Sequence, residues 1–151
     1  MSIINSFRGE FRFLSNFYQC PFEFDGLTYP NAEAAYQAQK CQDPSDRVKY
    51  TLIKNPVRAK QMGKREKLPE NWNASAYDIM DSILHAKFSN PQLAEMLKST
   101  GDAHIEEGNH WHDNRWGKCS CDKCSTKEGL NWMGKILMGI RTELNNVLKG
   151  E

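Results

Sequence analysis

The sequence has no long apolar run and almost no net charge. Across 151 residues, 20 Lys and Arg stand against 19 Asp and Glu, which leaves a formal charge of +1. Without a basic excess, broad binding of nucleic acid through counterion release is not expected, and any contact with DNA or RNA has to be local. No apolar stretch approaches the roughly 20 residues that a membrane span requires. We therefore expect no membrane partner.

The cysteines do not suit a secreted disulfide framework. There are five, an odd count, and three of them fall within CSCDKC at residues 119–124. Secreted frameworks normally use even counts at regular spacings. The opening MSIINSFRGEF also lacks the basic start and apolar stretch of a signal peptide. We expect a cytoplasmic protein with reduced thiols.

No internal repeat, low-complexity tract or Pro/Gly/Ser-rich linker divides the chain. A chain of 151 residues is long enough for one domain with a sizeable core but short for two domains. We predict a single α+β domain over residues 1–151, mostly helical, with a small N-terminal β-sheet. The clearest strand signal is FEFDGLTY at residues 22–29, where Asp-Gly separates two apolar-bearing runs as in a hairpin.

After Pro30 the pattern becomes helical. One stripe of α-helical period is formed by Tyr77, Met80, Leu84 and Phe88, with Ile83 beside it. A second stripe, in the last helix, comprises Ile136, Leu137, Ile140, Leu144 and Leu148. Both stripes predict core. Capping and stop signals give six helices, within residues 31–40, 43–55, 55–63, 74–88, 90–101 and 131–148.

The first of these helices, NAEAAYQAQK at residues 31–40, has an unusual face. Asn31 is placed to cap it, and Glu33 falls in its first turn. Gln37 and Lys40 follow Glu33 at spacings of four and three, with Tyr36 beside them. A solvated face needs only charge and a buried face only apolar atoms, so this mixture suggests a binding or catalytic surface. The alternatives are an exposed acid that favours the helix dipole and a solvated lysine at the helix end.

Residues 102–129 show no sustained period, yet they contain much of the chemistry of the chain. Irregular stretches of this length in compact domains are usually functional. One interpretation is a zinc site, in which Cys119, Cys121 and Cys124 bind with His110 or His112 as the fourth ligand. No second C-x-x-C pair follows, and a loop with reduced thiols is the alternative.

Two other interpretations concern nucleic acid and catalysis. A binding module would stack bases on Trp111, Trp116 and Trp132 and contact phosphates through Arg115 and Lys118. An enzyme pocket would use the carboxylates and the amide of this segment between flat aromatic walls. Cleavage of a ribosyl C–N bond passes through an oxocarbenium-like state, which a carboxylate stabilises while a second group positions water or protonates the departing base. The residues for this pocket are Glu107, Asn109 and Asp113.

Six stretches in order resemble the YbiA-like or NADAR family. They are FLSNFY, YPNAEAAYQAQK, AKQMG, ILHAKF, EGNHWHDNRWG and GLNWMGKILMGIR, and they span nearly the whole chain. The resemblance implies a YbiA-like, mostly helical α+β fold and an N-glycosidase activity. Family members act on phosphoribosylamino-pyrimidine intermediates of riboflavin synthesis or remove ADP-ribose from guanine in nucleic acid. The cysteine insert KCSCDKCSTKE is a departure from compact members of the family, so catalysis is not expected to need it.

The resemblance also implies roles for individual residues. Catalytic roles fall on Glu33, Lys40 and Asp113, with no cofactor and no catalytic metal. Helix 31–40 would form one wall of the pocket and the segment around 107–117 the facing wall. Substrate-binding roles fall on Asn16, Tyr36, Gln37, Glu107, Asn109, Trp111, Trp116 and Asn131.

Some of these roles have plain structural alternatives. Asp113 could cap the turn before Trp116, Trp116 could be a core anchor, and Asn131 could cap the last helix. Lys40 could form a Schiff base with an opened ribose or pair with a phosphate.

We therefore predict an N-glycosidase acting on a small ribosylated heterocycle. The alternatives are an ADP-ribosyl-guanine hydrolase and, from another class, a non-catalytic nucleotide or nucleic-acid binder.

Overall fold

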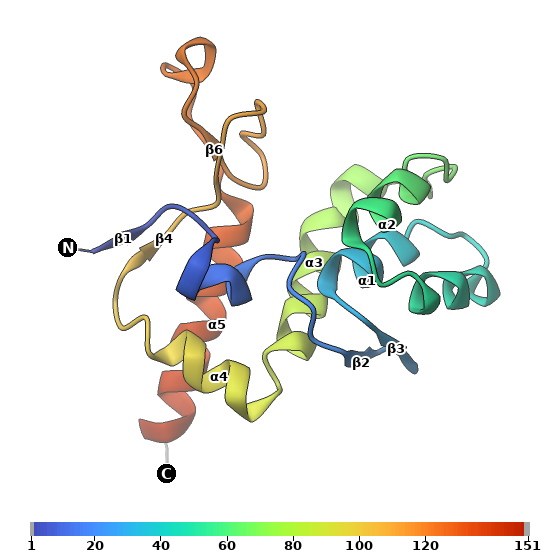
Figure 1. Cartoon of the computed structure of the whole chain (residues 1–151), viewed down its shortest axis with the longest axis horizontal. Helices are drawn as coiled ribbons and strands as arrows, with labels where there is room; N and C mark the ends of the chain where they lie inside the picture. The colour runs from blue at the N-terminus through green and yellow to red at the C-terminus, as the bar shows by residue number, and fades with distance from the viewer. Residues whose placement is uncertain (1, 150–151) are drawn as a thin grey trace. The chain divides into compact units, whose positions relative to one another are not determined.

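The computed structural model describes residues 2–149, with side chains up to residue 147. Contacts within the chain divide it into two compact units. One comprises Asn16–Asn90; the other comprises the chain up to Ser15 and from Pro91 onward. Helices predominate and the strands are short (Figure 1), so the predicted α+β class is confirmed. The assignment of residues 1–151 to a single domain stays a prediction.

The unit Asn16–Asn90 begins with the predicted hairpin. Strand β2 (Phe22–Phe24) pairs antiparallel with β3 (Leu27–Tyr29), and Glu23 lies opposite Thr28. Asp25 and Gly26 have φ values of 50° and 83°. Positive φ at both central residues is typical of the tight turn that Asp-Gly favours, because its twist matches that of the strands. The sequence signal and the observed turn agree.

Helix α1 (Ala32–Ala38) is the central element of this unit. The Asn31 side chain accepts a hydrogen bond from the Ala34 N–H at 2.9 Å, as expected of a cap. The helix packs against η2 (Pro44–Leu52), α2 (Pro56–Gly63) and α3 (Trp72–Lys87). All seven of its residues are buried. Four of the seven are alanines, whose small side chains let neighbouring elements approach the helix.

Two details of this unit differ from the sequence prediction. The helix expected within residues 43–55 is present as the 3₁₀ helix η2, not as an α-helix. Its β-branched residues Val48 and Thr51 lower α-helix propensity, and 3₁₀ turns commonly serve as connectors. In α3 the stripe from Met80 to Phe88 is buried as predicted, whereas Tyr77 is only half-buried.

The second unit is built around helix α5 (Trp132–Lys149), which packs against α4 (Pro91–Lys98) and strand β4 (His104–Ile105). Strand β1 (Ile3–Ile4) pairs parallel with β4. Leu144 is half-buried, and the Leu148 side chain lies outside the described residues. The buried apolar stripe of α5 contains Met133, Ile136, Leu137 and Ile140. The predicted core face of the last helix is confirmed at Ile136, Leu137 and Ile140, and Met133 extends it.

The irregular segment contains short elements that periodicity did not reveal. Strand β5 (Gly108–Asn109) pairs parallel with β6 (Lys118–Cys119), and η3 (Asp122–Cys124) follows. The 3₁₀ helix η1 (Gly9–Leu14) was likewise not predicted. A two-residue strand is too short for alternation to show, so these pairs depend on tertiary contacts.

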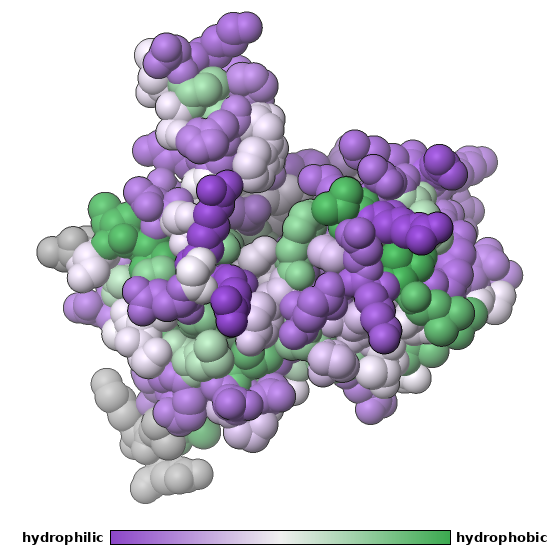
Figure 2. Space-filling model, in the orientation of Figure 1, coloured by the Kyte–Doolittle hydropathy of each residue, from purple (hydrophilic) through white to green (hydrophobic). Residues whose placement is uncertain are grey.

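Among the described residues, no helix is long and apolar enough to cross a membrane. On the face drawn in Figure 2, hydrophobic residues form separate patches among hydrophilic ones.

Candidate active site

Glu33 and Gln37 form a polar pair on the buried helix α1. The Gln37 Nε2 donates a hydrogen bond to the Glu33 Oε1 at 2.8 Å. Glu33 is 7% exposed and Gln37 is 4% exposed. Burial raises the pKa of the Glu33 carboxyl, although the Gln37 hydrogen bond and the charges of Lys60 and Lys40 oppose this effect. An exposed acid that merely favours the helix dipole is therefore not what the structure shows.

Lys40 follows α1 and is half-buried, with its amine close to two aromatic rings. Its Nζ is 5.9 Å from the ring centroid of Tyr36 and 5.9 Å from that of Trp72. The two rings are 5.3 Å apart and inclined at 53°. Burial lowers the pKa of the Lys40 amine, and the nearby Glu33 carboxylate opposes this effect. The structure thus brings together the four polar side chains that the sequence placed on one face.

Opposite pKa shifts in neighbouring groups are characteristic of acid–base chemistry. A carboxyl with a raised pKa keeps its proton to higher pH, whereas an amine with a lowered pKa becomes neutral at lower pH. Both directions favour the uncharged form of each group, which is the form that donates a proton from a carboxyl or attacks as an amine. Glu33 and Lys40 are arranged in this way.

Gly63, the last residue of α2, packs against the amide of Gln37. A Cβ at this position would overlap the Gln37 Oε1. That oxygen is buried and accepts no hydrogen bond within the described part of the chain. The close approach of α2 therefore restricts the Gln37 amide, and through it the Glu33 carboxylate.

Asn16 contacts the first turn of α1. Its backbone carbonyl accepts a hydrogen bond from the Glu33 N–H at 3.0 Å, and its Nδ2 is 3.6 Å from the Met80 Sδ. The FLSNFY turn therefore positions the first turn of α1. A substrate contact by Asn16 stays a prediction.

Lys87 was missed as a functional candidate. It is fully buried in α3, and burial lowers the pKa of its amine to about 8. Its Nζ is 5.8 Å from the Tyr18 ring centroid and 5.2 Å from that of Phe88. The signal was available, because Lys87 follows Ile83 by four residues on the apolar stripe of α3. A lysine on a core stripe is rare enough to mark as a candidate.

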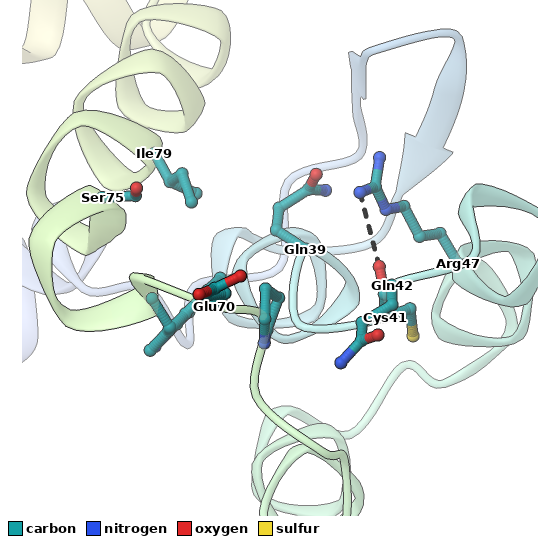
Figure 3. Close-up of a pocket in the computed structure, with 9 residues that line it drawn as sticks. Gln39, Cys41, Gln42, Arg47, Glu70, Ser75 and Ile79 are labelled. Carbon is teal, nitrogen blue, oxygen red and sulfur yellow. Dashed lines mark hydrogen bonds between the residues drawn. The ribbon is translucent and has the colours of Figure 1, made fainter.

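A pocket of about 320 Å³ lies beside the end of α1. Gln39, Arg47, Glu70 and Ser75 give it polar walls (Figure 3), and Trp72 belongs both to this pocket and to the aromatic surroundings of Lys40. None of the site residues predicted from the sequence lines it.

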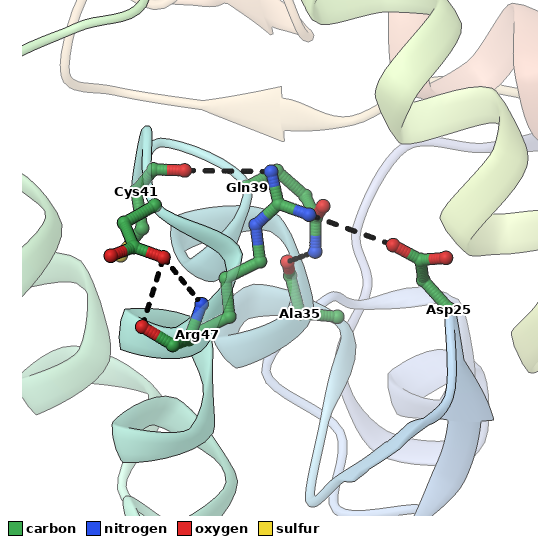
Figure 4. Close-up of polar contacts among 7 residues, drawn as sticks. Asp25, Ala35, Gln39, Cys41 and Arg47 are labelled. Atoms are coloured by element: carbon green, nitrogen blue, oxygen red, sulfur yellow. Dashed lines mark hydrogen bonds and ion pairs between the residues drawn. The ribbon is translucent and has the colours of Figure 1, made fainter.

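Arg47 is fixed at the edge of this pocket by two contacts (Figure 4). Its Nη2 donates to the Cys41 carbonyl at 3.4 Å, and its Nη1 is 3.5 Å from the Asp25 carboxylate. Its Nε is buried and has no hydrogen-bond partner among the described residues. A guanidinium at this position can bind an anionic group of a ligand.

In the other unit, Asn109 and Asp113 shape a turn. The Asn109 Oδ1 accepts from the backbone N–H groups of Trp111 and Asp113 at 3.3 and 3.1 Å, and its Nδ2 donates to the Asp113 carbonyl at 2.7 Å. The Asp113 Oδ1 caps the N–H groups of Arg115 and Trp116 at 3.0 and 2.9 Å. The capping alternative for Asp113 is therefore observed, and its charge-stabilising role stays a prediction.

The aromatic residues of this unit differ in exposure. Trp116 is half-buried and packs edge-on against Trp132 at 5.2 Å, while Trp111 is 60% exposed. Trp111 is thus accessible to a ligand without being part of this aromatic pair.

The Asn131 side chain is hydrogen-bonded to the backbone of Glu107. The Asn131 Oδ1 accepts from the Glu107 N–H at 3.0 Å, and its Nδ2 donates to the Ile105 carbonyl at 2.8 Å. Asn131 therefore ties the start of α5 to strand β4, which is a structural role beyond the predicted cap. The substrate contacts of both residues stay predictions.

The residues predicted for catalysis fall in both units, Glu33 and Lys40 in one and Asp113 in the other. The expectation that the two segments form facing walls of one pocket stays a prediction. The unit that contains Asp113 also holds a cluster of metal-ligating side chains, formed by His112, Cys119, Cys121 and Cys124.

Comparison with known proteins identifies the family of the chain. The NADAR domain model matches residues 5–145. The chain belongs to the NADAR family. Among NADAR relatives, "N-glycosidase YbiA" of Escherichia coli K12 is 32% identical over 137 residues, covering 86% of this chain and 79% of that protein. "N-glycosidase Npun_R5314" of Nostoc punctiforme is 31% identical over 140 residues, covering 89% of this chain and 86% of that protein.

Two further NADAR similarities concern a plant protein and a solved structure. The chloroplastic riboflavin biosynthesis protein PYRR of Zea mays is 34% identical over 133 residues, which are 80% of this chain but 20% of that protein. The NMR structure of E. coli YbiA matches 99% of this chain and 89% of its own, with a TM-score of 0.83 and 29% identity. The resemblance read from the sequence is confirmed. The family includes enzymes named as N-glycosidases, which hydrolyse N-glycosyl bonds.

Proposed function

We propose that this NADAR protein is an N-glycosidase that hydrolyses the ribosyl C–N bond of a small phosphoribosylamino-pyrimidine, an intermediate of riboflavin synthesis. The observation that supports this most is the buried Glu33 carboxyl beside the half-buried Lys40 amine, with pKa values shifted in opposite directions. The relatives named as N-glycosidases favour an enzyme over a non-catalytic binder.

We propose that Glu33 acts first on the departing base and then on the sugar. In its protonated form it donates a proton to the leaving nitrogen, and its raised pKa keeps the carboxyl protonated to higher pH than usual. Once ionised, it stabilises the positive charge on the oxocarbenium-like ribose. Gln37 holds one of its oxygens, so the direction of the carboxyl is fixed before substrate binds.

Lys40 has two proposed roles. As a neutral amine it attacks the anomeric carbon and displaces the base, which leaves with a proton from Glu33; the sugar ring then opens to a Schiff base, which water hydrolyses to free ribose and the amine. As a cation it pairs with the substrate phosphate. Its lowered pKa favours the first role.

The similarity to the maize riboflavin biosynthesis protein supports the choice of substrate. The alternative substrate is ADP-ribosylated guanine in nucleic acid. A formal charge of +1 disfavours a long nucleic-acid footprint, but a single flipped base needs little surface. The expected cytoplasmic location, which rests on reduced thiols, stays a prediction.

A comparison of substrates tests the proposal. The protein is incubated with a phosphoribosylamino-pyrimidine and, separately, with DNA carrying ADP-ribosylated guanine, at equal enzyme and substrate concentrations. We expect many turnovers on the pyrimidine, measured by chromatography of the released base and sugar phosphate. Faster release from the DNA would reverse the substrate assignment, and saturation at one equivalent without product on both would contradict an enzyme.

Borohydride added during turnover separates the two roles of Lys40. If the Schiff base forms, reduction traps a covalent sugar adduct on Lys40, and Lys40→Arg abolishes turnover although it keeps the charge. Lys67→Arg, at an exposed lysine of the same unit, serves as the matched control. An active Arg variant without a trapped adduct would leave the phosphate role.

A further inference from the structure

We propose that His112, Cys119, Cys121 and Cys124 bind one zinc ion in a structural site. The sequence alone left the cysteine insert open between a zinc site and a loop of reduced thiols, and it offered two histidines as the fourth ligand. In the structure the four ligand atoms all lie within 4.8 Å of one another. None of the four is among the residues proposed for catalysis.

The spacing of the ligand atoms is close to that of a tetrahedral zinc site. The His112 Nδ1 is 3.3 Å from the Cys121 Sγ, 3.4 Å from the Cys124 Sγ and 3.9 Å from the Cys119 Sγ. Zn–S and Zn–N bonds of about 2.3 and 2.05 Å at tetrahedral angles require N···S separations of about 3.6 Å and S···S separations of about 3.8 Å. The nitrogen is therefore already placed correctly, and the sulfurs need to move by about 1 Å at most to close on an ion.

The backbone around the cluster positions each ligand. Strands β5 and β6 pair with Asn109 opposite Cys119, and the Asn114 Oδ1 accepts a hydrogen bond from the Cys119 N–H at 2.9 Å. The turn η3 brings Cys124 back over Cys121, with a backbone hydrogen bond of 3.0 Å between them. His112 has a φ of 69°, in the left-handed region. Residues separated by up to twelve positions thus converge.

Two backbone N–H groups point at the sulfur of Cys119. The His112 N–H donates at 3.3 Å and the Cys121 N–H at 3.5 Å. Such donors stabilise the negative charge of a thiolate, the form in which cysteine binds metal, and outer hydrogen bonds of this kind are usual around bound metals.

The structure also distinguishes the two histidines. His110 is exposed, and its Nδ1 lies 3.1 Å from the Ser120 Oγ, outside the cluster. His112 is the histidine whose nitrogen meets the sulfurs. A disulfide would use two of the three thiols and leave the third and the imidazole unexplained, whereas a tetrahedral ion uses all four.

The composition of the cluster favours zinc in a closed, structural role. Three thiolates and one imidazole complete a four-coordinate shell and leave no open position for substrate or water. The ion would join η3 to the turn that begins at Asn109, and so hold the position of Trp111 next to His112.

Metal analysis and cobalt substitution test the site. The full chain, purified under reducing conditions without chelator, is expected to contain one zinc ion per chain by elemental analysis. Replacement by Co²⁺ should give the intense visible bands of a tetrahedral ion and a thiolate charge-transfer band. A pale octahedral cobalt spectrum, a disulfide detected by intact mass, or iron with inorganic sulfide would overturn the zinc assignment.

A pair of histidine variants provides the matched comparison. Asparagine tolerates the left-handed φ of His112 but does not replace its imidazole, so His112→Asn tests the ligand without straining the backbone. We expect His112→Asn to lower Zn²⁺ affinity by more than the roughly 10- to 100-fold that loss of an outer partner costs. His110→Asn should bind as wild type does. Equal affinities of the two variants would contradict the assignment of His112.

Discussion

Glu33 is the residue at which stability and the proposed activity oppose each other. Burial raises the pKa of its carboxyl above the ordinary value of 4.5. The folded protein therefore keeps this proton to higher pH than the unfolded chain does. As pH rises above that ordinary value, the unfolded chain releases the proton first, and the carboxyl progressively lowers the free energy of unfolding. A buried acid with a stability cost is retained where function needs it.

Replacement of Glu33 by glutamine should separate these two effects. Glu33→Gln keeps the shape of the side chain and an oxygen that can accept from Gln37, but it removes the charge. We expect turnover to fall on the order of a hundredfold or more. The variant should unfold at a higher temperature than wild type at about pH 7, with a smaller advantage near pH 4, where the carboxyl is largely protonated.

Thermal unfolding at the two pH values and steady-state kinetics provide the measurements. Glu23→Gln, at an exposed position of β2, is the control and should change neither quantity. Wild-type turnover in Glu33→Gln would remove α1 from the active site.

At the scale of elements, the packing of α2 on α1 explains why α2 ends in glycine. A Cβ at Gly63 would overlap the Gln37 Oε1 and push the amide away from the Glu33 carboxylate. We expect Gly63→Ala to lower kcat on the order of a hundredfold, the effect of a displacement of about 1 Å in a catalytic group.

Two comparisons distinguish this local effect from general damage. Gly139→Ala in α5 meets no atom within 4 Å, so it should keep full activity and raise stability by about 0.5–1 kcal/mol. In a Gln37→Ala background, Gly63→Ala should have little further effect, because the atoms that it displaces are gone. Additive losses in that double variant would contradict the proposed contact.

The sequence predicted those elements whose signals are local. Asn31 as a cap and Asp25-Gly26 as a hairpin turn depend on neighbouring residues, and both are observed. The parallel pairs β1–β4 and β5–β6 join residues far apart in the chain and contain two residues per strand. No periodicity encodes such pairs. The 3₁₀ form of η2 was missed for a related reason, because capping signals mark where a helix begins without fixing its type.

For the candidate site, spacing placed Glu33, Tyr36, Gln37 and Lys40 together but could not reveal that α1 is buried. Burial depends on what packs around the helix, and burial is what shifts the two pKa values. Lys87 is the converse case, since an apolar stripe predicts core and the structure shows a lysine amine buried in it. The choice of His112 over His110 required the turn that begins at Asn109, which spacing does not describe.

At the scale of the whole molecule, the two units hold different chemistry. Glu33 and Lys40, which are proposed for catalysis, lie in the unit Asn16–Asn90. The metal-ligating cluster lies in the other unit. Neither Glu33 nor Lys40 offers a ligand to that cluster. A structural ion and a metal-independent reaction are therefore compatible within one chain.

Metal removal should consequently change substrate binding and leave bond cleavage intact. After chelation, verified by elemental analysis, we expect the rate at saturating substrate to stay essentially unchanged. KM should rise, because the ion would hold His112 next to Trp111, which is proposed to contact substrate. Asp113, in contrast, is held by its own hydrogen bonds with Asn109, Arg115 and Trp116. Steady-state and single-turnover kinetics of the zinc-loaded and zinc-depleted protein separate the two quantities. A loss of the saturated rate that Zn²⁺ restores and Mg²⁺ does not would show that the reaction itself depends on the metal.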